Sequence, residues 1–90
     1  MFYVYVLLSD KDRKLYVGLT SDLRERIRKH KSGRVPSTVN RLPVRLIYYE
    51  CYMMEFEAKR RELYLKGGNG REQLKIQISE TLKKFGYRFR

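Results

Sequence analysis

The chain has 90 residues and a formal net charge of +11, so it offers room for one domain and one core. Its 42% hydrophobic content excludes a disordered chain, and no apolar run approaches the ~20 residues that span a bilayer. A single cysteine excludes an internal disulfide and fits a reducing, cytoplasmic setting. Such an excess of positive charge opposes compaction by self-repulsion, which indicates a polyanionic partner. We therefore expect one basic domain over residues 1–90.

Two strands and a hairpin loop are expected at the start of the chain. Residues 2–8 are β-branched and aromatic, which predicts a strand and not a signal peptide. Polar residues 9–13 predict the loop, and residues 14–18 predict the second strand. Strand side chains alternate between the two faces of a sheet, so this register predicts two sets of neighbours. The core set is Val4, Val6, Leu8, Leu15 and Val17, and the other set is Tyr3, Tyr5, Leu7, Lys14 and Tyr16.

A helix is predicted next, over about residues 21–31. Thr20 or Ser21 can cap its N-terminus. Leu23 and Ile27 lie four residues apart and are expected to face the core. Two apolar residues are too few for a membrane-surface helix, which disfavours a membrane as the partner.

The second half predicts one more strand and two more helices. Residues 33–44 are expected to form a loop with two prolines, and residues 45–52 a strand. This strand has apolar residues on both of its faces, so it or its neighbour should lie in the centre of the sheet with both faces buried. A helix over residues 55–66 follows, and a glycine pair separates it from a third helix that reaches to about residue 84. We expect an α+β fold in which a small, three-stranded, mostly antiparallel sheet is flanked by about three helices.

The two C-terminal helices each show an apolar stripe, and the last one also shows a start signal. Asn69 to Glu72 resembles a capping box. The predicted stripe of the helix over residues 55–66 consists of Phe56, Ala58, Leu63 and Leu65. That of the last helix consists of Leu74, Ile78 and Leu82.

Positive charge is concentrated in the middle of the chain. Between Arg24 and Arg45 there are eight Lys or Arg residues and one acid, Glu25. The tail adds Lys83, Lys84, Arg88 and Arg90. A solvated charged face is the ordinary interpretation of a charge run, but this local imbalance favours a nucleic-acid backbone.

A series of short motifs resembles the GIY-YIG nuclease family, and in particular its small, single-domain members. The series is Tyr3-Val4-Tyr5, then Tyr16-Val17-Gly18, then Leu23-x-x-Arg26-Ile27-x-x-His30, then Arg61-Glu62. It covers about residues 2–66, and residues 67–90 add a C-terminal helix and a basic tail. The first motif departs from the family pattern because Tyr3 stands in place of its first glycine.

The resemblance implies a small sheet flanked by helices and the metal-dependent hydrolysis of phosphodiester bonds. It implies one divalent ion, Mg²⁺ or Mn²⁺, with Glu62 as the metal ligand. The implied catalytic residues are Tyr5, Tyr16, Arg26, His30 and Glu62. Taken singly, each of these residues has an ordinary structural role, such as a packed tyrosine or a surface ion pair, so their joint order carries the hypothesis.

The chemistry of phosphodiester hydrolysis is consistent with these residue types. One carboxylate is enough for Mg²⁺, which keeps several waters, and an arginine offers a fixed fork for phosphate oxygens. A tyrosine has a reference pKa near ~10 and needs nearby cations to act as a base. By resemblance, Tyr5 is the expected general base, Tyr16 would bond the phosphate or the water, and His30 would orient the nucleophile or contact the phosphate.

The expected substrate is DNA rather than RNA, in branched, nicked or single-stranded form, with a role in repair or recombination. The expected substrate-binding residues are Lys14, Gly18, Arg24, Lys29, Arg34 and Arg41. Gly18 would let the backbone approach the substrate closely. A specific site on DNA buries ~1,000 Å² or more of protein, so a second copy or a partner protein could supply the remaining contacts. The alternative is a basic module that binds nucleic acid without cleaving it.

Overall fold

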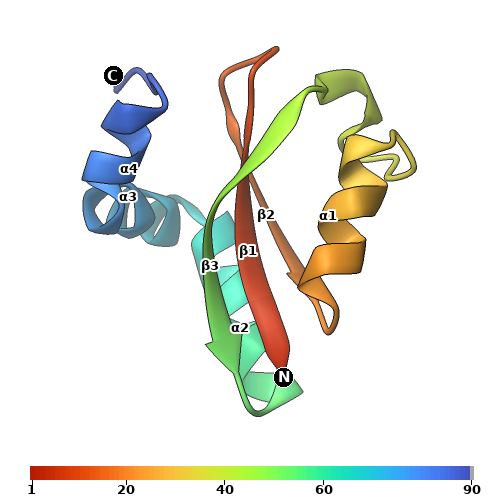
Figure 1. Ribbon diagram of the computed structural model, residues 1–90. Coiled ribbons are helices and arrows are strands. Elements are labelled where there is room, and N and C mark those ends of the chain that lie inside the picture. Colours follow the sequence, from red (N-terminus) through yellow and green to blue (C-terminus); the bar gives the residue numbers. More distant parts are fainter. Residues whose placement is uncertain (90) are drawn as a thin grey trace.

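The computed structural model describes residues 1–89, and its centre is a three-stranded antiparallel sheet of order β2-β1-β3 (Figure 1). The strands are β1 (Phe2–Ser9), β2 (Leu15–Thr20) and β3 (Val44–Tyr52). β1 pairs antiparallel with both neighbours. The α+β fold and its small antiparallel sheet are therefore confirmed, and the covered central strand is β1.

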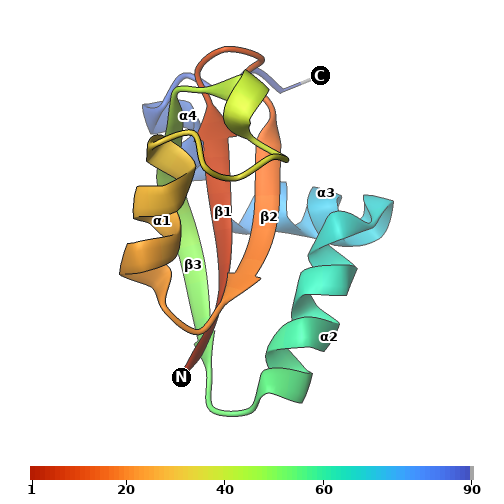
Figure 2. The ribbon, with the colours of Figure 1, turned by 90° about the vertical axis from the view of Figure 1, so that its right-hand side faces the viewer.

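Four α-helices flank the sheet, rather than about three. They are α1 (Leu23–Lys31), α2 (Glu55–Lys66), α3 (Gly68–Gln77) and α4 (Ser79–Lys84), and a short 3-10 helix η1 (Val39–Arg41) lies in the loop before β3. The chain turns at Ile78, which separates the expected last helix into α3 and α4. α1 lies on one face of the sheet, and α2 to α4 lie on the other (Figures 1 and 2). No helix in the described residues is long and apolar enough to cross a membrane.

The predicted alternation of the hairpin is confirmed. One apolar cluster packs the predicted core set of the hairpin against α2, α3 and α4, and its buried members are Val4, Val6, Leu8, Leu15, Val17, Ala58, Leu65, Leu74, Ile78 and Leu82. The opposite cluster lies under α1 and contains Tyr5, Leu7 and Val44, packed against Tyr16, Leu23, Ile27, Leu42 and Leu46. β1 is thus covered on both faces, so its side chains are buried whether they point toward α1 or toward α2 to α4.

The predicted stripe of α2 was partly wrong. Phe56 and Leu63 are 72% and 59% exposed. The buried positions are Ala58, Glu62 and Leu65, which follow the spacing of four and three that defines one helix face. The packing of α2 onto the sheet therefore turns a carboxylate inward and leaves two large apolar side chains outside.

The predicted helix starts also differ in detail. Asp22 caps α1 by accepting a bond from the Glu25 backbone amide at 3.2 Å. α3 begins at Gly68 with no side-chain cap, so the expected capping box is absent. At Gly70, an added Cβ would overlap the carbonyl of Tyr64. The start of α3 thus packs directly on the backbone at the end of α2.

Candidate active site

The hydroxyl of Tyr5 is the centre of the candidate site. Tyr5 lies on the central strand β1, points toward α1 and is 0% exposed. Its Oη lies 2.8 Å from Nε2 of His30 and accepts a longer bond of 3.4 Å from Nε of Arg26. Arg26 and His30 lie four residues apart on α1, so one face of that helix presents both groups to the same phenol.

Gly18 makes room for the Tyr5 ring. The two residues are direct partners across β1 and β2. A Cβ at residue 18 would overlap Cζ and Oη of Tyr5. We expected this glycine to bring the backbone close to the substrate. In the structure its missing side chain accommodates the tyrosine.

His30 is held in one orientation by two bonds. It is 0% exposed, and its Nδ1 lies 2.7 Å from Oγ1 of Thr38. Burial, with a smaller effect from the Arg26 charge, lowers the pKa of His30 to about 4. The imidazole is therefore neutral at pH 7, with a proton on only one nitrogen.

A neutral imidazole donates a hydrogen bond from one nitrogen and accepts one at the other. With the proton on Nδ1, Tyr5 donates to Nε2 and Nδ1–H of His30 donates to Oγ1 of Thr38; with the proton on Nε2, both bonds run the opposite way. The result is a short chain of hydrogen bonds from Tyr5 through His30 to Thr38.

Tyr16 lies at the more accessible end of this cluster. Its ring centroid is 5.3 Å from that of His30 and 6.4 Å from that of Tyr5. Its side chain is half-buried, and its hydroxyl accepts a bond from Oγ of Ser37 at 3.1 Å. Of the two phenols, Tyr16 is therefore the one whose hydroxyl meets the exposed loop.

Opposing influences act on the Tyr5 phenol. Burial is the largest and raises the pKa of Tyr5, while the hydrogen bond and charge of Arg26 lower it. The pKa of Arg26 is itself raised, chiefly by its bond to Tyr5. The phenol is therefore protonated at rest, and Arg26 is placed to stabilise the phenolate when the proton leaves.

Glu62 is a buried carboxylate with two ammonium partners. Its side chain is 7% exposed, and its Oε1 and Oε2 lie 3.0 Å from Nζ of Lys59 and Nζ of Lys66. Burial works against ionisation, but the two lysines prevail and the pKa of Glu62 is lowered. The carboxylate is therefore negative at neutral pH and carries the positive neighbours that a buried charge requires.

Glu62 belongs to the helical layer on the other side of the sheet from α1. Its negative charge nevertheless raises the pKa of Tyr5, although by less than burial does. Coulomb interactions weaken with distance, and no hydrogen bond between described residues joins the two groups. The acid therefore lies within electrostatic range of the phenol without touching it.

The residues present fit a hard divalent ion that keeps most of its water. Glu62 offers two carboxylate oxygens that already attract positive charge. Within residues 1–89 no group of three or more His, Cys, Asp or Glu side chains could form a cage. One carboxylate with water is a donor set that suits Mg²⁺. Such an ion would have to compete with the two ammonium groups.

The expected substrate-binding cations lie in three places. Arg24 and Lys29 are exposed on α1, and Arg34 is exposed in the turn that follows. Lys14 is exposed and lies immediately before β2. Arg41 is bound within the protein, because its Nε donates to Asp12 at 2.6 Å and its Nη2 donates to the Lys14 carbonyl at 3.2 Å.

Some members of the site were not expected as such. Lys59 and Lys66 stand three before and four after Glu62, a spacing that predicts ion pairs on a helix. Thr38 and Ser37 carry no local signal of their roles, because the loop before β3 has to fold over His30 to bring them there. Only the tertiary structure places these two hydroxyls.

Comparisons with known proteins identify the family of this chain. The family model of the GIY-YIG catalytic domain matches residues 1–75. The chain belongs to the GIY-YIG family. This is a family of nuclease domains, and the match confirms the resemblance and extends it beyond residue 66 into α3.

Several known proteins resemble the chain over most of its length. A UPF0213 protein of Clostridium perfringens is 38% identical over 88 residues, which cover 97% of this chain and 94% of the relative. A UPF0213 protein of Pediococcus acidilactici is 39% identical over 80 residues, or 82% of this chain and 78% of the relative. The solution NMR structure of a UPF0213 protein from Bacillus halodurans matches with a TM-score of 0.55 at 32% identity, covering 98% of this chain and 100% of that one.

Proposed function

We propose that this chain hydrolyses phosphodiester bonds of DNA, with a divalent ion held at Glu62. The observation that carries the proposal is the Tyr5 hydroxyl, bonded to a neutral histidine and to Arg26. A nuclease needs a proton acceptor and a nearby fixed cation at one place. The Tyr5–His30 pair and Arg26 stand at positions that match the motifs of the GIY-YIG family.

The hydrogen-bond chain offers a path for the proton of the attacking water. As Tyr5 Oη takes that proton, the hydroxyl proton of Tyr5 passes to Nε2 of His30. In the tautomer that accepts it, Nδ1 keeps its own proton and its hydrogen bond to Thr38. The hydroxide then attacks phosphorus, and the bond to the leaving oxygen breaks. A bound phosphate brings negative charge near His30, which favours the protonated imidazole and eases the transfer.

Tyr5 is proposed as the base, with Tyr16 in a supporting role. Tyr5 has the two neighbours that a phenolate needs, a proton acceptor and a guanidinium. Tyr16 has a more accessible hydroxyl, which is suited to bonding the phosphate or the water. Tyr5→Phe and Tyr16→Phe separate these roles, because each removes one hydroxyl and keeps the ring. Tyr5→Phe should lower the rate more.

A divalent ion bound at Glu62 would supply Lewis-acid neutralisation of the charge that grows on the phosphate oxygens. Arg26 would share that task from the other side, as a fixed fork for phosphate oxygens. The substrate would then lie between α1 and the edge of the sheet at β2, within reach of both phenols. Mg²⁺ and Mn²⁺ both suit a carboxylate with water.

The decisive experiment is a cleavage assay on the purified chain. Labelled single-stranded, nicked and branched DNA, and the matching RNA, are incubated with Mg²⁺, Mn²⁺ or a chelator. We expect metal-dependent cleavage, strongest on one of the structured DNAs, because a small domain reads shape more readily than sequence. A role in repair or recombination predicts that branched or nicked DNA is preferred.

Matched variants test whether the proposed residues are needed for cleavage. Glu62→Gln and Arg26→Gln should each lower cleavage by about 100-fold or more. Glu57→Gln changes an exposed acid on the same helix and should cleave normally. No cleavage by the wild type, with tight and salt-sensitive DNA binding, would establish the non-catalytic module instead.

A further inference from the structure

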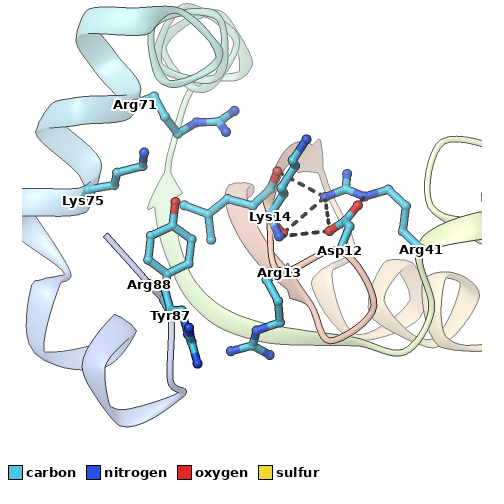
Figure 3. A pocket seen from close by; sticks show the side chains of 9 residues that line it. Asp12, Arg13, Lys14, Arg41, Arg71, Lys75, Tyr87 and Arg88 are labelled. Carbon is cyan, nitrogen blue, oxygen red and sulfur yellow. Dashed lines mark hydrogen bonds and ion pairs between the residues drawn. The ribbon is translucent and has the colours of Figure 1, made fainter. Parts of the chain in front are cut away.

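A large cavity lies outside the candidate active site, between the β1–β2 hairpin and the C-terminal helices (Figure 3). Its volume is about 810 Å³. It is lined by Asp12, Arg13, Lys14, Leu15, Arg41, Arg71, Lys75, Tyr87 and Arg88. The lining joins segments far apart in the chain, so the cavity exists only in the folded protein.

The cavity is strongly positive. Six of its lining residues are Lys or Arg, and one, Asp12, is an acid. The hydrogen bond from Arg41 is the main reason that the pKa of Asp12 is lowered to about 2, so this acid balances Arg41. Arg13 and Lys75 pair with acids outside the lining, Asp10 at 2.9 Å and Glu72 at 3.3 Å. Among the described residues, Lys14, Arg71 and Arg88 have no acidic partner, so the lining stays net positive. Like charges gathered around one hollow repel each other, which indicates an anionic occupant.

Several of these cations are held in position. Nε of Arg71 donates to the Leu65 carbonyl at 3.1 Å, and Nη2 of Arg13 donates to the Phe85 carbonyl at 2.7 Å. A carbonyl carries no net charge, so the bond of Arg71 leaves its positive charge unbalanced, whereas Arg13 also pairs with Asp10 at 2.9 Å. Arg71 and Lys75 extend from α3 toward Lys14 of the hairpin (Figure 3). The cavity therefore has cations on both of its walls.

Lys14 brings the cavity near the candidate active site along the chain. Lys14 and Tyr16 lie two residues apart in extended backbone, so their Cα atoms are about 7 Å apart. Lys14 lines the cavity, and Tyr16 contacts the ring of His30. An extended anionic chain that passes Tyr16 would reach the cavity at its next charged group.

We propose that this cavity binds the phosphate backbone of the nucleic-acid strand next to the bond at the active site. The inference rests on the proposed function for its orientation, because Tyr16 defines the end from which the strand enters. It adds Arg13, Arg71, Lys75 and Arg88 to the expected contacts. Three of these, Arg71 and Lys75 on α3 and Arg88 beyond α4, come from the segment that follows the two family motifs on α1 and α2.

The lining favours a phosphate chain over an apolar ligand. The uncharged members are Leu15 and Tyr87, and Nζ of Lys75 lies 5.7 Å from the centroid of the Tyr87 ring. Lysine and arginine heads bind phosphate oxygens without reading sequence. The cavity would therefore contribute affinity and position, and little base preference.

The test is the salt dependence of DNA binding, measured by fluorescence anisotropy in the presence of a chelator, so that no strand is cut. The cavity pair is Lys14→Gln with Lys75→Gln. The control pair is Lys83→Gln with Lys84→Gln, which removes the same charge from the exposed surface of α4. The slope of log K against log salt should fall by about 1.5 in the cavity pair, close to the loss of two phosphate contacts. The control pair should keep the wild-type slope.

Further arms make the result decisive. Replacing Lys14 and Lys75 by Arg keeps the charge and should keep the slope. Equal slopes for the cavity and control pairs would overturn the inference. So would a cavity pair that loses binding of tripolyphosphate but keeps its slope on DNA, since the cavity would then serve a small polyanion. Cleavage by the wild-type protein is measured separately. If the wild type does not cleave DNA but the cavity pair still has the smaller salt slope, the result supports phosphate binding in the cavity and overturns only the nuclease proposal.

Discussion

Tyr5 and Gly18 are direct partners across two strands, and the tyrosine ring occupies the space that any side chain at residue 18 would need. This pairing links two motifs that lie far apart in the sequence. It also explains why the second motif requires a glycine in this chain, since the Tyr5 ring could not occupy this place otherwise.

Gly18→Ala should therefore destabilise the protein by about 2 kcal/mol, because the added methyl group overpacks a buried site. The measurement is the free energy of unfolding in urea. Gly68→Ala is the matched control, because nothing lies within 4 Å of its added Cβ, and it should change stability by ~0.5 kcal/mol or less. A second change, Tyr5→Leu, should recover part of the loss in Gly18→Ala. Equal stability of the two alanine variants would contradict this account of the glycine.

The single histidine of the chain should make stability depend on pH. Burial and Arg26 lower the pKa of His30 from 6.5 to about 4, so between these values the unfolded chain binds a proton that the folded chain does not. Stability is then fully present above pH 6.5 and is lost as the pH falls toward 4. From pH 6.5 to about pH 5 the loss should be about 2 kcal/mol.

The carboxylates contribute little in that interval, because their unfolded pKa values lie lower, near ~4. The measurement is urea unfolding at several pH values. His30→Gln should be less stable at pH 7 and should lose this dependence above pH 5. A dependence unchanged in His30→Gln would assign it to another group.

Lys66 should compete with a metal ion for Glu62. Its ammonium lies 3.0 Å from Oε2 of Glu62, and a divalent ion at that oxygen has to displace it. Lys66→Gln should therefore lower the Mn²⁺ concentration at half-maximal binding or cleavage by about fivefold, the equivalent of ~1 kcal/mol. Lys84→Gln serves as the charge-matched control. An unchanged or raised Mn²⁺ requirement in Lys66→Gln would place the ion away from Oε2.

Arg61 should act on stability rather than on chemistry. Its guanidinium donates to both oxygens of Glu50, at 2.9 and 3.1 Å, and Tyr48 and Tyr52 each donate to the same carboxylate at 2.7 Å. Arg61→Gln leaves a mostly buried carboxylate without its cation and should cost roughly 2 kcal/mol. Arg60→Gln removes a neighbouring cation that packs over the Phe56 ring and should cost ~0.5 kcal/mol.

The activity of these two arginine variants completes the test. Both should cleave at the wild-type rate at a temperature where they are folded, as judged by circular dichroism. Loss of cleavage in a fully folded Arg61→Gln protein would place Arg61 in the site beside Glu62.

The hairpin and the motif residues were open to prediction because their signals are local. Alternation in residues 2–8 and 14–18 separates Tyr5 from Val4 and Val6 by parity alone, and both faces are as expected. The spacing of Arg26 and His30 likewise puts both side chains on one face of α1. Regular geometry within one element was enough for these assignments.

The face that each helix turns inward was harder to predict, because it depends on what covers it. Phe56 and Leu63 are apolar yet exposed, while Glu62 is charged yet buried between Ala58 and Leu65. Hydrophobicity alone favours the opposite arrangement. The packing of α2 against the sheet, with Lys59 and Lys66 as partners for the buried charge, decides it.

By itself, then, the sequence determined the sheet, the family and the groups that could do chemistry, because periodicity and motif order are written along the chain. The tertiary structure alone decided that Thr38 bonds His30, that Gly18 accommodates Tyr5, and that six cations surround one cavity. The physical reason is that each of these depends on atoms from distant segments, and contacts over such separations leave no local pattern.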